Sequence, residues 1–411
     1  MRGDRRRACL VDVAVTLVLR YADVGVATYA SLRVVGEPAR TVTWVVQEPD
    51  LVAALDQLSA ALPDPVAAEA RRDAVERAVA SGPFAAPATE LAIARTLGRN
   101  LLSPEAWQLL VDCVASPRAA LFVSPSARMA RVPWGLLAMP NDDGFRLMEF
   151  TDVLMAAPSN IANSTRTAAE WDERRDGSPL LILDPRVPGQ RPDSALGSVL
   201  GRPSAETALA QHFAELMRQR AVLPDVAGAV ELFRRTDADR PWLGRQLDRQ
   251  PSRLLYVGHA TAADGDVGHA NRAALHLADE RPLTASDLMS AELPMPPRIA
   301  MIACASGGDY QFDEATGLVA AMILGGAQLV TATLWSLPTA AGYRQFASAA
   351  ADHDPMAEVI IAVDRAHREP DAGRAVNSWQ REQMRRWRDG DTGASPLYWA
   401  ALATFAVDGV R

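Results

Sequence analysis

Two apolar runs, RLLYVGHA at residues 253–260 and RIAMIACASGG at residues 298–308, determine how the chain can fold. Each run is short, apolar without interruption and followed by small residues. Such continuous apolarity is typical of a parallel strand that is covered on both faces of its sheet. His259 and Cys304 leave the ends of the two runs, and ligands of open α/β sheets bind beyond the carboxyl ends of such strands. The pattern therefore predicts a cleft at which an imidazole and a thiol meet.

Strand and helix signals alternate on the amino-terminal side of these runs. Strands are expected at residues 120–123, 153–156, 180–183 and 230–233, and helices at 87–97, 104–114, 204–221 and 242–247. A run rich in Pro and Gly at 187–203 predicts a surface loop. This alternation predicts right-handed crossovers and a mostly parallel sheet.

The first part of the chain has a different pattern. It predicts three strands, at residues 10–18, 24–35 and 41–46, and then helices that begin at Pro49 and at Asp64-Pro65. Ser81-Gly82-Pro83 is the expected boundary. Residues 1–82 form an amino-terminal region of unknown role, with binding or sensing as the default, and residues 83–411 form the second domain, with a core at about 178–411.

Further short motifs follow one another in a fixed order. They are LLYVGHA (254–260), ALHL (274–277), LTASD (283–287), ACASG (303–307), GLV (317–319), GGA (325–327) and TLW (333–335). LFVSP (121–125) with VPWGLL (132–137) precedes the series, and SPLYWAA (395–401) is expected to be its closing strand. As an ordered set these motifs resemble the CHAT domain family, which belongs with the caspases, separases and gingipain-like peptidases. The resemblance extends from roughly Pro87 to the C-terminus.

The resemblance implies a caspase-like three-layer sandwich with a mostly parallel central sheet, preceded by a small α+β region. It also implies a cysteine endopeptidase with a dyad of His259 and Cys304, of a bacterial regulatory or defence kind, which a partner or signal controls. Its substrate would be a protein or peptide. The alternative is a caspase-like scaffold that has lost activity and binds proteins.

Thiol chemistry gives each dyad residue a role. An unperturbed cysteine is mostly protonated at neutral pH, so the thiol of Cys304 needs His259 to accept its proton and later to protonate the leaving amine. The amides of Ala260 and Cys304 are the expected oxyanion hole. Relatives usually carry glycine at the position of Ala260, and an alanine there would be strained if the position needed positive φ. A buried structural cysteine and an ordinary histidine are the alternative reading of the two residues.

Substrate preference is expected from three further residues. Asp184 follows the strand at 180–183, Asp309 follows Cys304, and Trp335 ends another strand. Two carboxylates beside an aromatic wall would select an Arg or Lys side chain before the scissile bond. The alternative is that Asp184 caps the turn before Pro185 and that Asp309 lies in solvent.

Composition limits the partners and the compartment. The net charge of −8 argues against general affinity for nucleic acid or an anionic membrane surface. The three cysteines, Cys9, Cys113 and Cys304, do not make a paired framework, which favours a cytoplasmic protein. The six histidines form no ligand cluster and no P-loop follows Gly325-Gly326, so neither a metal nor another cofactor is expected. Arg5-Arg6-Arg7 before an apolar run imitates a secretion signal, but Asp12 interrupts the run and favours a first strand.

Overall fold

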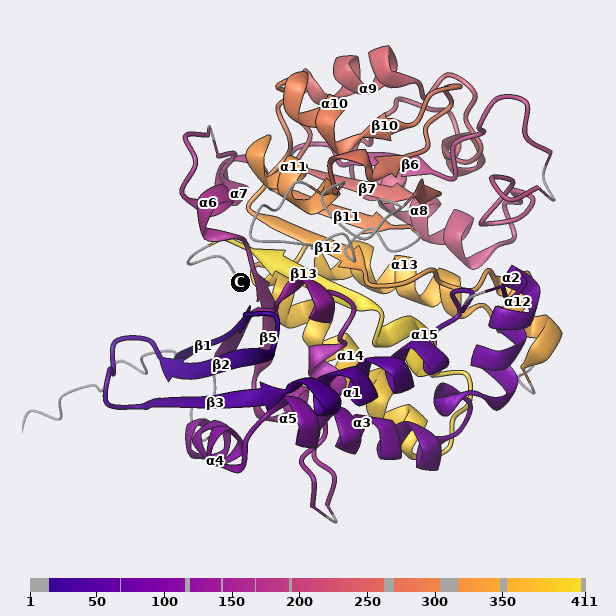
Figure 1. Ribbon diagram of the computed structural model, residues 1–411. Helices are drawn as coiled ribbons and strands as arrows, with labels where there is room; N and C mark the ends of the chain where they lie inside the picture. Colours follow the sequence, from indigo (N-terminus) through magenta and orange to yellow (C-terminus); the bar gives the residue numbers. More distant parts are fainter. Residues whose placement is uncertain are drawn as a thin grey trace, which may run out of the picture.

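A mixed sheet of ten strands runs through the centre of the molecule (Figure 1). The computed structural model describes residues 15–66, 68–114, 119–141, 143–166, 168–191, 194–261, 270–303, 317–347 and 353–407. The strands are β1 (Thr16–Asp23), β2 (Ala27–Val34), β3 (Thr41–Gln47), β4 (Ala120–Ser124), β5 (Asp152–Ala156), β6 (Leu180–Leu183), β7 (Arg253–Val257), β8 (Ala260–Thr261), β9 (Ala274–Leu275), β10 (Leu283–Thr284), β11 (Arg298–Ile302), β12 (Leu329–Thr333) and β13 (Leu402–Ala406). β8, β9 and β10 form a separate antiparallel ribbon.

The large sheet consists of two parallel blocks, with β2 and β3 added as antiparallel strands at one edge. Its order is β3-β2-β1-β4-β5-β13-β12-β11-β7-β6. β12, β11, β7 and β6 are parallel to one another, and they meet the block of β1, β4, β5 and β13 at the antiparallel pair β12–β13. The carboxyl ends of β6, β7, β11 and β12 therefore lie together at one edge of the sheet. The predicted α/β fold with a mostly parallel central sheet is confirmed.

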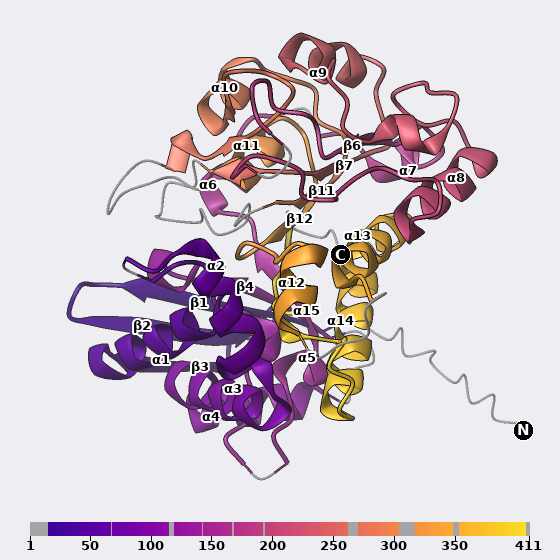
Figure 2. The ribbon, with the colours of Figure 1, turned by 90° about the vertical axis from the view of Figure 1, so that its right-hand side faces the viewer.

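Helices cover both faces of the sheet. They are α1 (Glu48–Ala61), α2 (Arg71–Glu76), α3 (Pro87–Leu101), α4 (Pro104–Cys113), α5 (Leu147–Phe150), α6 (Ser159–Ala162), α7 (Trp171–Arg174), α8 (Ala208–Gln219), α9 (Arg240–Leu247), α10 (Ala285–Ser290), α11 (Leu318–Leu324), α12 (Ala340–Phe346), α13 (Pro355–Ala366), α14 (Ala372–Arg388) and α15 (Pro396–Trp399). Figure 2 shows α10 and α11 on one side of β7, β11 and β12, and α8 and α13 on the other. Because both faces are covered, every residue of β7, β11 and β12 is buried.

Side chains at the first turns explain where several of these helices begin. Ser103, Thr207, Asp239, Thr339 and Asp354 each accept a hydrogen bond from a main-chain amide of the helix that follows. Such caps satisfy amides that have no partner inside the helix. They fix the start of α8, α9, α12 and α13, which lie around the carboxyl edge of the β6–β12 block.

The amino-terminal strands belong to the same sheet as the rest of the chain. β1 pairs in parallel with β4, for example Leu17 with Leu121, and β2 and β3 continue the sheet outward. The expected boundary at residues 81–83 therefore lies inside a continuous structure: Phe84, just after it, is buried and lies 6.2 Å from the ring of Trp335.

Three strand predictions need correction. Residues 230–233 were expected to form a strand, but Ala229–Leu232 form a 3-10 turn and Phe233 makes only an isolated bridge with Leu183 of β6. The motif at 395–401 holds the short helix α15, with Ser395 as its cap, and the closing strand follows it as β13. β13 is also antiparallel to β12, although the alternation of elements suggested a parallel neighbour.

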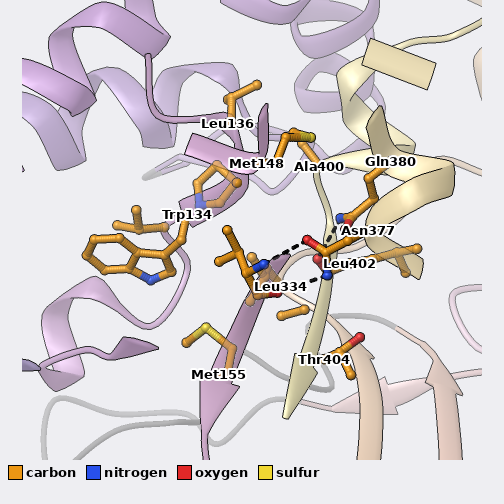
Figure 3. A pocket seen from close by; sticks show the side chains of 15 residues that line it. Trp134, Leu136, Met148, Met155, Leu334, Asn377, Gln380, Ala400, Leu402 and Thr404 are labelled. Carbon is orange, nitrogen blue, oxygen red and sulfur yellow. Dashed lines mark hydrogen bonds between the residues drawn. The ribbon is translucent and has the colours of Figure 1, made fainter. Parts of the chain in front are cut away.

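A short helix-to-sheet junction lies where β5 and β13 separate, inside one of the two blocks (Figure 3). β5 and β13 pair only at Met155–Phe405 and Ala156–Ala406. Where they separate, the side-chain amide of Asn377 in α14 donates to the carbonyl of Val153 and accepts from its amide, each at 3.0 Å. The space left there measures about 30 Å³, which is too small for a substrate side chain. The junction is structural.

The described part of the chain contains no helix that is both long and apolar enough to cross a membrane.

Candidate active site

His259 leaves the end of β7 and is almost fully buried, with 7% of its surface exposed. Its Nε2 lies 3.0 Å from the main-chain carbonyl oxygen of Gly197. A carbonyl oxygen can only accept a hydrogen bond, so Nε2 carries the proton in the neutral ring. Nδ1 is then the nitrogen with a free lone pair, and it is the atom that can act as a base.

Tyr256 holds two neighbouring main-chain segments, at His259 and at His276. Its hydroxyl lies 2.7 Å from the carbonyl oxygen of His259 and 2.8 Å from that of His276. Gly258 lies over this hydroxyl: a Cβ at that position would be 2.8 Å from the Tyr256 oxygen and 3.3 Å from Cδ of Pro185. The glycine is therefore needed for close packing beneath the histidine.

Ala260 lies in the β8–β9 ribbon and has ordinary backbone angles, since it is not among the residues with positive φ. The ribbon bonds the amide of His276 to the carbonyl of His259 at 3.0 Å, and it pairs Ala260 with Leu275. This pattern makes Ala260 and Leu275 a non-hydrogen-bonded pair, so the ladder does not use the amide of Ala260. The strain considered for an alanine at this position does not arise. The role of its amide in an oxyanion hole stays a prediction.

Cys304 lies outside the described residues, as do Cys9 and Asp309. The register of the sheet fixes the position of the last described residues before Cys304. Ile302 pairs with Val257 in the β11–β7 ladder, so His259 and Cys304 each follow a paired residue by two positions. Ala303, the last described residue before the gap, is buried, and its carbonyl accepts a hydrogen bond from the hydroxyl of Thr333. The pairing of His259 with Cys304 stays a prediction.

Asp184 has a set of partners that the sequence did not indicate. Its side chain is fully buried, and one carboxylate oxygen accepts from the Ser198 hydroxyl at 2.7 Å and from the amides of Val199 and Leu200. The other oxygen lies 3.2 Å from the guanidinium of Arg234. Both oxygens are thus engaged with this chain, and the geometry does not support Asp184 as a receptor for a substrate cation.

Arg234 links this carboxylate to the histidine. Its Nη1 also donates to the carbonyl of Gly197 at 3.1 Å, the oxygen that accepts from His259. Asp184 and Arg234 both adopt positive φ, which is unusual outside glycine and is held here by the surrounding contacts. Through the loop at 197–200 and Arg234, Asp184 fixes the acceptor of the histidine.

Trp335 does not face the cleft. It is fully buried, its indole nitrogen donates to the carbonyl of Leu397 at 2.9 Å, and its ring lies against Phe84. These contacts do not support the predicted role of Trp335 as a wall of the substrate pocket, because its side chain is enclosed and lies against Phe84.

A second histidine lies close to the first. Nε2 of His276 is 2.6 Å from the hydroxyl of Thr261, and burial together with the nearby charge of His259 lowers the pKa of His276. The lowered pKa favours the neutral form of His276, which adds no positive charge beside the ring of His259.

A cavity of about 400 Å³ opens beside His259. It is bounded by the ends of β7 and β11, by the loop around Ser198, by α2 and by the segment from Leu337 to α12. These elements meet at the right-hand side of Figure 1, where the carboxyl ends of β6, β7 and β11 point. Its size suits a few side chains of a peptide.

Sequence reasoning missed four contributors to this site: Gly197, Ser198, Arg234 and the helix α2. The Pro-rich and Gly-rich loop was expected only as surface, and no local signal connects it with a histidine 62 residues later. Within the described ranges, no three His, Cys, Asp or Glu side chains lie close enough to hold a metal ion.

The family model described as CHAT domain matches residues 91–407. Among solved structures, two crystal structures of the Saccharomyces cerevisiae separase–securin complex are similar, at 11% and 9% identity and TM-scores of 0.44 and 0.43. Each alignment covers 95% of this chain and 30% of the other, so the chain spans less than a third of those separase chains. No curated protein matches the chain.

Proposed function

The chain belongs to the CHAT domain family of caspase-like proteins, and from this we propose that it is a cysteine endopeptidase with His259 as base and Cys304 as nucleophile. The observation that carries the proposal is the contact of His259 Nε2 with Gly197, which leaves Nδ1 as the basic atom at the end of β7. β11, which leads to Cys304, is the direct neighbour of that strand and in register with it.

The chemistry balances in two steps. Nδ1 of His259 takes the proton of the Cys304 thiol, the sulfur bonds to the peptide carbonyl carbon, and the C–N bond breaks as the imidazolium protonates the leaving amine. Water then adds to the thioester and gives its proton to His259, and the C–S bond breaks to release the acid and the thiolate. The amides of Ala260 and Cys304 are proposed to stabilise the oxyanion in both steps.

One observation favours the peptidase over the alternative, a scaffold that has lost activity. That alternative depended on Ala260 being unable to adopt the backbone of a glycine, and Ala260 is free of positive φ. We retain a bacterial regulatory or defence role, a cytoplasmic location and control by a protein partner as parts of the proposal, which the family resemblance supports.

The test is covalent labelling of the full chain. A peptide acyloxymethyl ketone should add its mass to Cys304, and His259→Ala should slow that addition strongly because the thiolate loses its base. Addition at another residue, or labelling that persists in Cys304→Ala, would refute the assignment of the nucleophile.

A further inference from the structure

The helix α2 (Arg71–Glu76) borders the cavity beside His259, although it precedes the segment that matches the family model. Arg71, Arg72 and Val75 of this helix line the cavity. Figures 1 and 2 both show α2 next to α12, on the side of the sheet edge where the strands end. The amino-terminal region therefore contributes directly to the site.

Arg77 fixes the chain that leads into α2. Its guanidinium donates to the carbonyls of Leu62 and Asp64, each at 3.1 Å, and it pairs with Glu69 at 2.8 Å. The bond from Arg77 is the main cause that lowers the pKa of Glu69 to about 2. The guanidinium of Arg77 therefore holds the segment before α2 in place.

A second ion pair attaches this segment to the sheet. Asp64 pairs with Arg131, and Nε of Arg131 donates to the carbonyl of Leu334 at 3.3 Å, directly after β12. The position of α2 relative to the strand ends is therefore set by several independent contacts.

α2 also packs on α12, which borders the same cavity. A Cβ at Gly342 would lie 3.8 Å from Cγ1 of Val75, and the guanidinium of Arg72 lies 5.9 Å from the ring centre of Phe346. The aromatic face orients Arg72 while leaving its N–H groups at the edge of the guanidinium able to donate.

The described lining of the cavity has a charge opposite to that of the whole chain. The chain has a net charge of −8, yet the described residues that line the cavity include two arginines and no Asp or Glu. Asp73 and Glu76 of the same helix are exposed and do not line it. A cationic cavity in an acidic protein attracts anionic groups selectively.

We propose that Arg71 and Arg72 are specificity residues that bind carboxylate side chains of an acidic peptide substrate. The inference rests on the proposed function in taking the occupant of the cavity as the substrate. It replaces the preference for Arg or Lys, since Asp184 is engaged with Arg234 and Trp335 is buried. An acidic peptide fits better than nucleic acid, because two arginines at one small cavity give no continuous path for a phosphate backbone.

The experiment measures binding to the full-length Cys304→Ala protein by fluorescence anisotropy, so that no cleavage is needed. The probes are a fluorescein-labelled glutamate-rich peptide and the same peptide with glutamine. We expect the glutamate peptide to bind about tenfold more tightly, and each of Arg71→Gln and Arg72→Gln to reduce this preference about threefold. Arg344→Gln is the matched control, because Arg344 is exposed on α12 and does not line the cavity.

The outcomes of this experiment test the role of Arg71 and Arg72 separately from the peptidase proposal. Equal binding of the two peptides, an equal loss in Arg344→Gln, or tighter binding of a single-stranded oligonucleotide would overturn the inference, even if Cys304 is labelled. A glutamate preference that the double arginine variant removes would support it, even if no probe labels Cys304 and the peptidase proposal fails. Weakening of the glutamate preference by added salt in the Cys304→Ala protein, with both arginines present, supports it without a fold-sensitive substitution.

Discussion

Nε2 of His259 donates to the main-chain carbonyl oxygen of Gly197 at 3.0 Å, so a loop, and not a carboxylate, orients the imidazole. Arg234 donates to the same oxygen at 3.1 Å and pairs with Asp184, which holds the next three residues of that loop. A buried ion pair behind the loop keeps this acceptor in place. The orientation of the His259 ring therefore depends on Asp184 and Arg234, which contact the loop and not the ring.

We expect Cys304→Ala and His259→Ala each to abolish peptide cleavage and leave the fold intact, because nucleophile and base act as one unit. Cleavage of a peptide library and the circular dichroism spectrum of each variant measure the two effects. Cys9→Ser and Cys113→Ser are the controls and should keep full turnover. Cys113 is buried in the core, so its substitution should cost about 1 kcal/mol of stability. Retained cleavage in either dyad variant would contradict the mechanism.

Asp184→Asn should reduce the labelling rate of Cys304 by about ten- to hundredfold, because the acceptor of His259 loses its anchor. Ser198→Ala removes one of the bonds to that carboxylate, without a change of charge, and should have a smaller effect in the same direction. The pH dependence of the labelling rate distinguishes two roles of Asp184. If Asp184 positions His259, the substitution shifts this pH dependence. If Asp184 only helps to bind the probe, the substitution raises the probe concentration that gives half-maximal labelling.

Asp264→Asn is the comparison for that experiment. Asp264 lies in the segment between His259 and β9, outside the described residues. Its substitution should weaken labelling less than Asp184→Asn does. An equal effect of the two substitutions would show that Asp184 acts only through net charge.

The central strands and the position of His259 could be predicted because their signals are local. Leu254–Val257 and Ile299–Ile302 are continuous apolar runs with small residues after them, and the structure pairs them in register. Helices cover both faces of these strands, so all five residues of each strand are buried. The apolar run that marks each strand is therefore visible in the local sequence.

The substrate side of the site could not be predicted, because its contacts join distant segments. Asp184 meets Arg234 after 50 residues, and Trp335 is covered by Phe84 from far earlier in the chain. A carboxylate at a strand end has the same local sequence whether it faces a substrate or an internal arginine. α2 also precedes the motifs of the family resemblance, so no motif connected Arg71 with His259.

Ala260→Gly should leave the labelling rate of Cys304 nearly unchanged. Ala260 has no positive φ, so a glycine relieves no strain, and it should lower stability by about 0.5–1 kcal/mol through the entropy of the unfolded chain. Turnover and urea denaturation of the same preparation separate the two effects. A large loss of turnover would mean that the oxyanion hole lies elsewhere.

Gly258→Ala should destabilise the protein by about 1–3 kcal/mol, because the new Cβ would lie 2.8 Å from the hydroxyl oxygen of Tyr256. Tyr256 is buried and held by two carbonyls, so it cannot move away at low cost. Adding Tyr256→Phe removes that oxygen and should recover about 1 kcal/mol relative to the sum of the single changes. Strictly additive losses in urea denaturation would contradict a direct clash.

The stability of the protein should fall as the pH drops below about 6.5, because of His367 at the opposite end of the sheet from the cavity. His367 is fully enclosed, with Nε2 2.8 Å from the Thr331 hydroxyl, and burial, followed by the charges of Arg298 and Arg253, lowers its pKa to about 3. Its unfolded pKa is near 6.5, so between these values the unfolded chain binds a proton that the folded chain does not. Proton binding by the unfolded chain therefore lowers the stability of the fold progressively as the pH falls from about 6.5 to about 3, and the contribution of His367 is fully present above about pH 6.5.

Asp364 adds a second loss at lower pH. Burial alone would raise the pKa of this carboxyl, but Arg253 and His212 outweigh that effect and hold its pKa well below the usual value. Its stabilisation is therefore complete above about pH 4 and disappears as the pH falls further. Urea denaturation of the wild type and of His367→Gln between pH 7 and 4.5 isolates the histidine, because Asp364 stays charged in that range. The free energy of unfolding should fall less steeply with decreasing pH in His367→Gln, and parallel slopes in the two proteins would show that His367 is not the group that titrates.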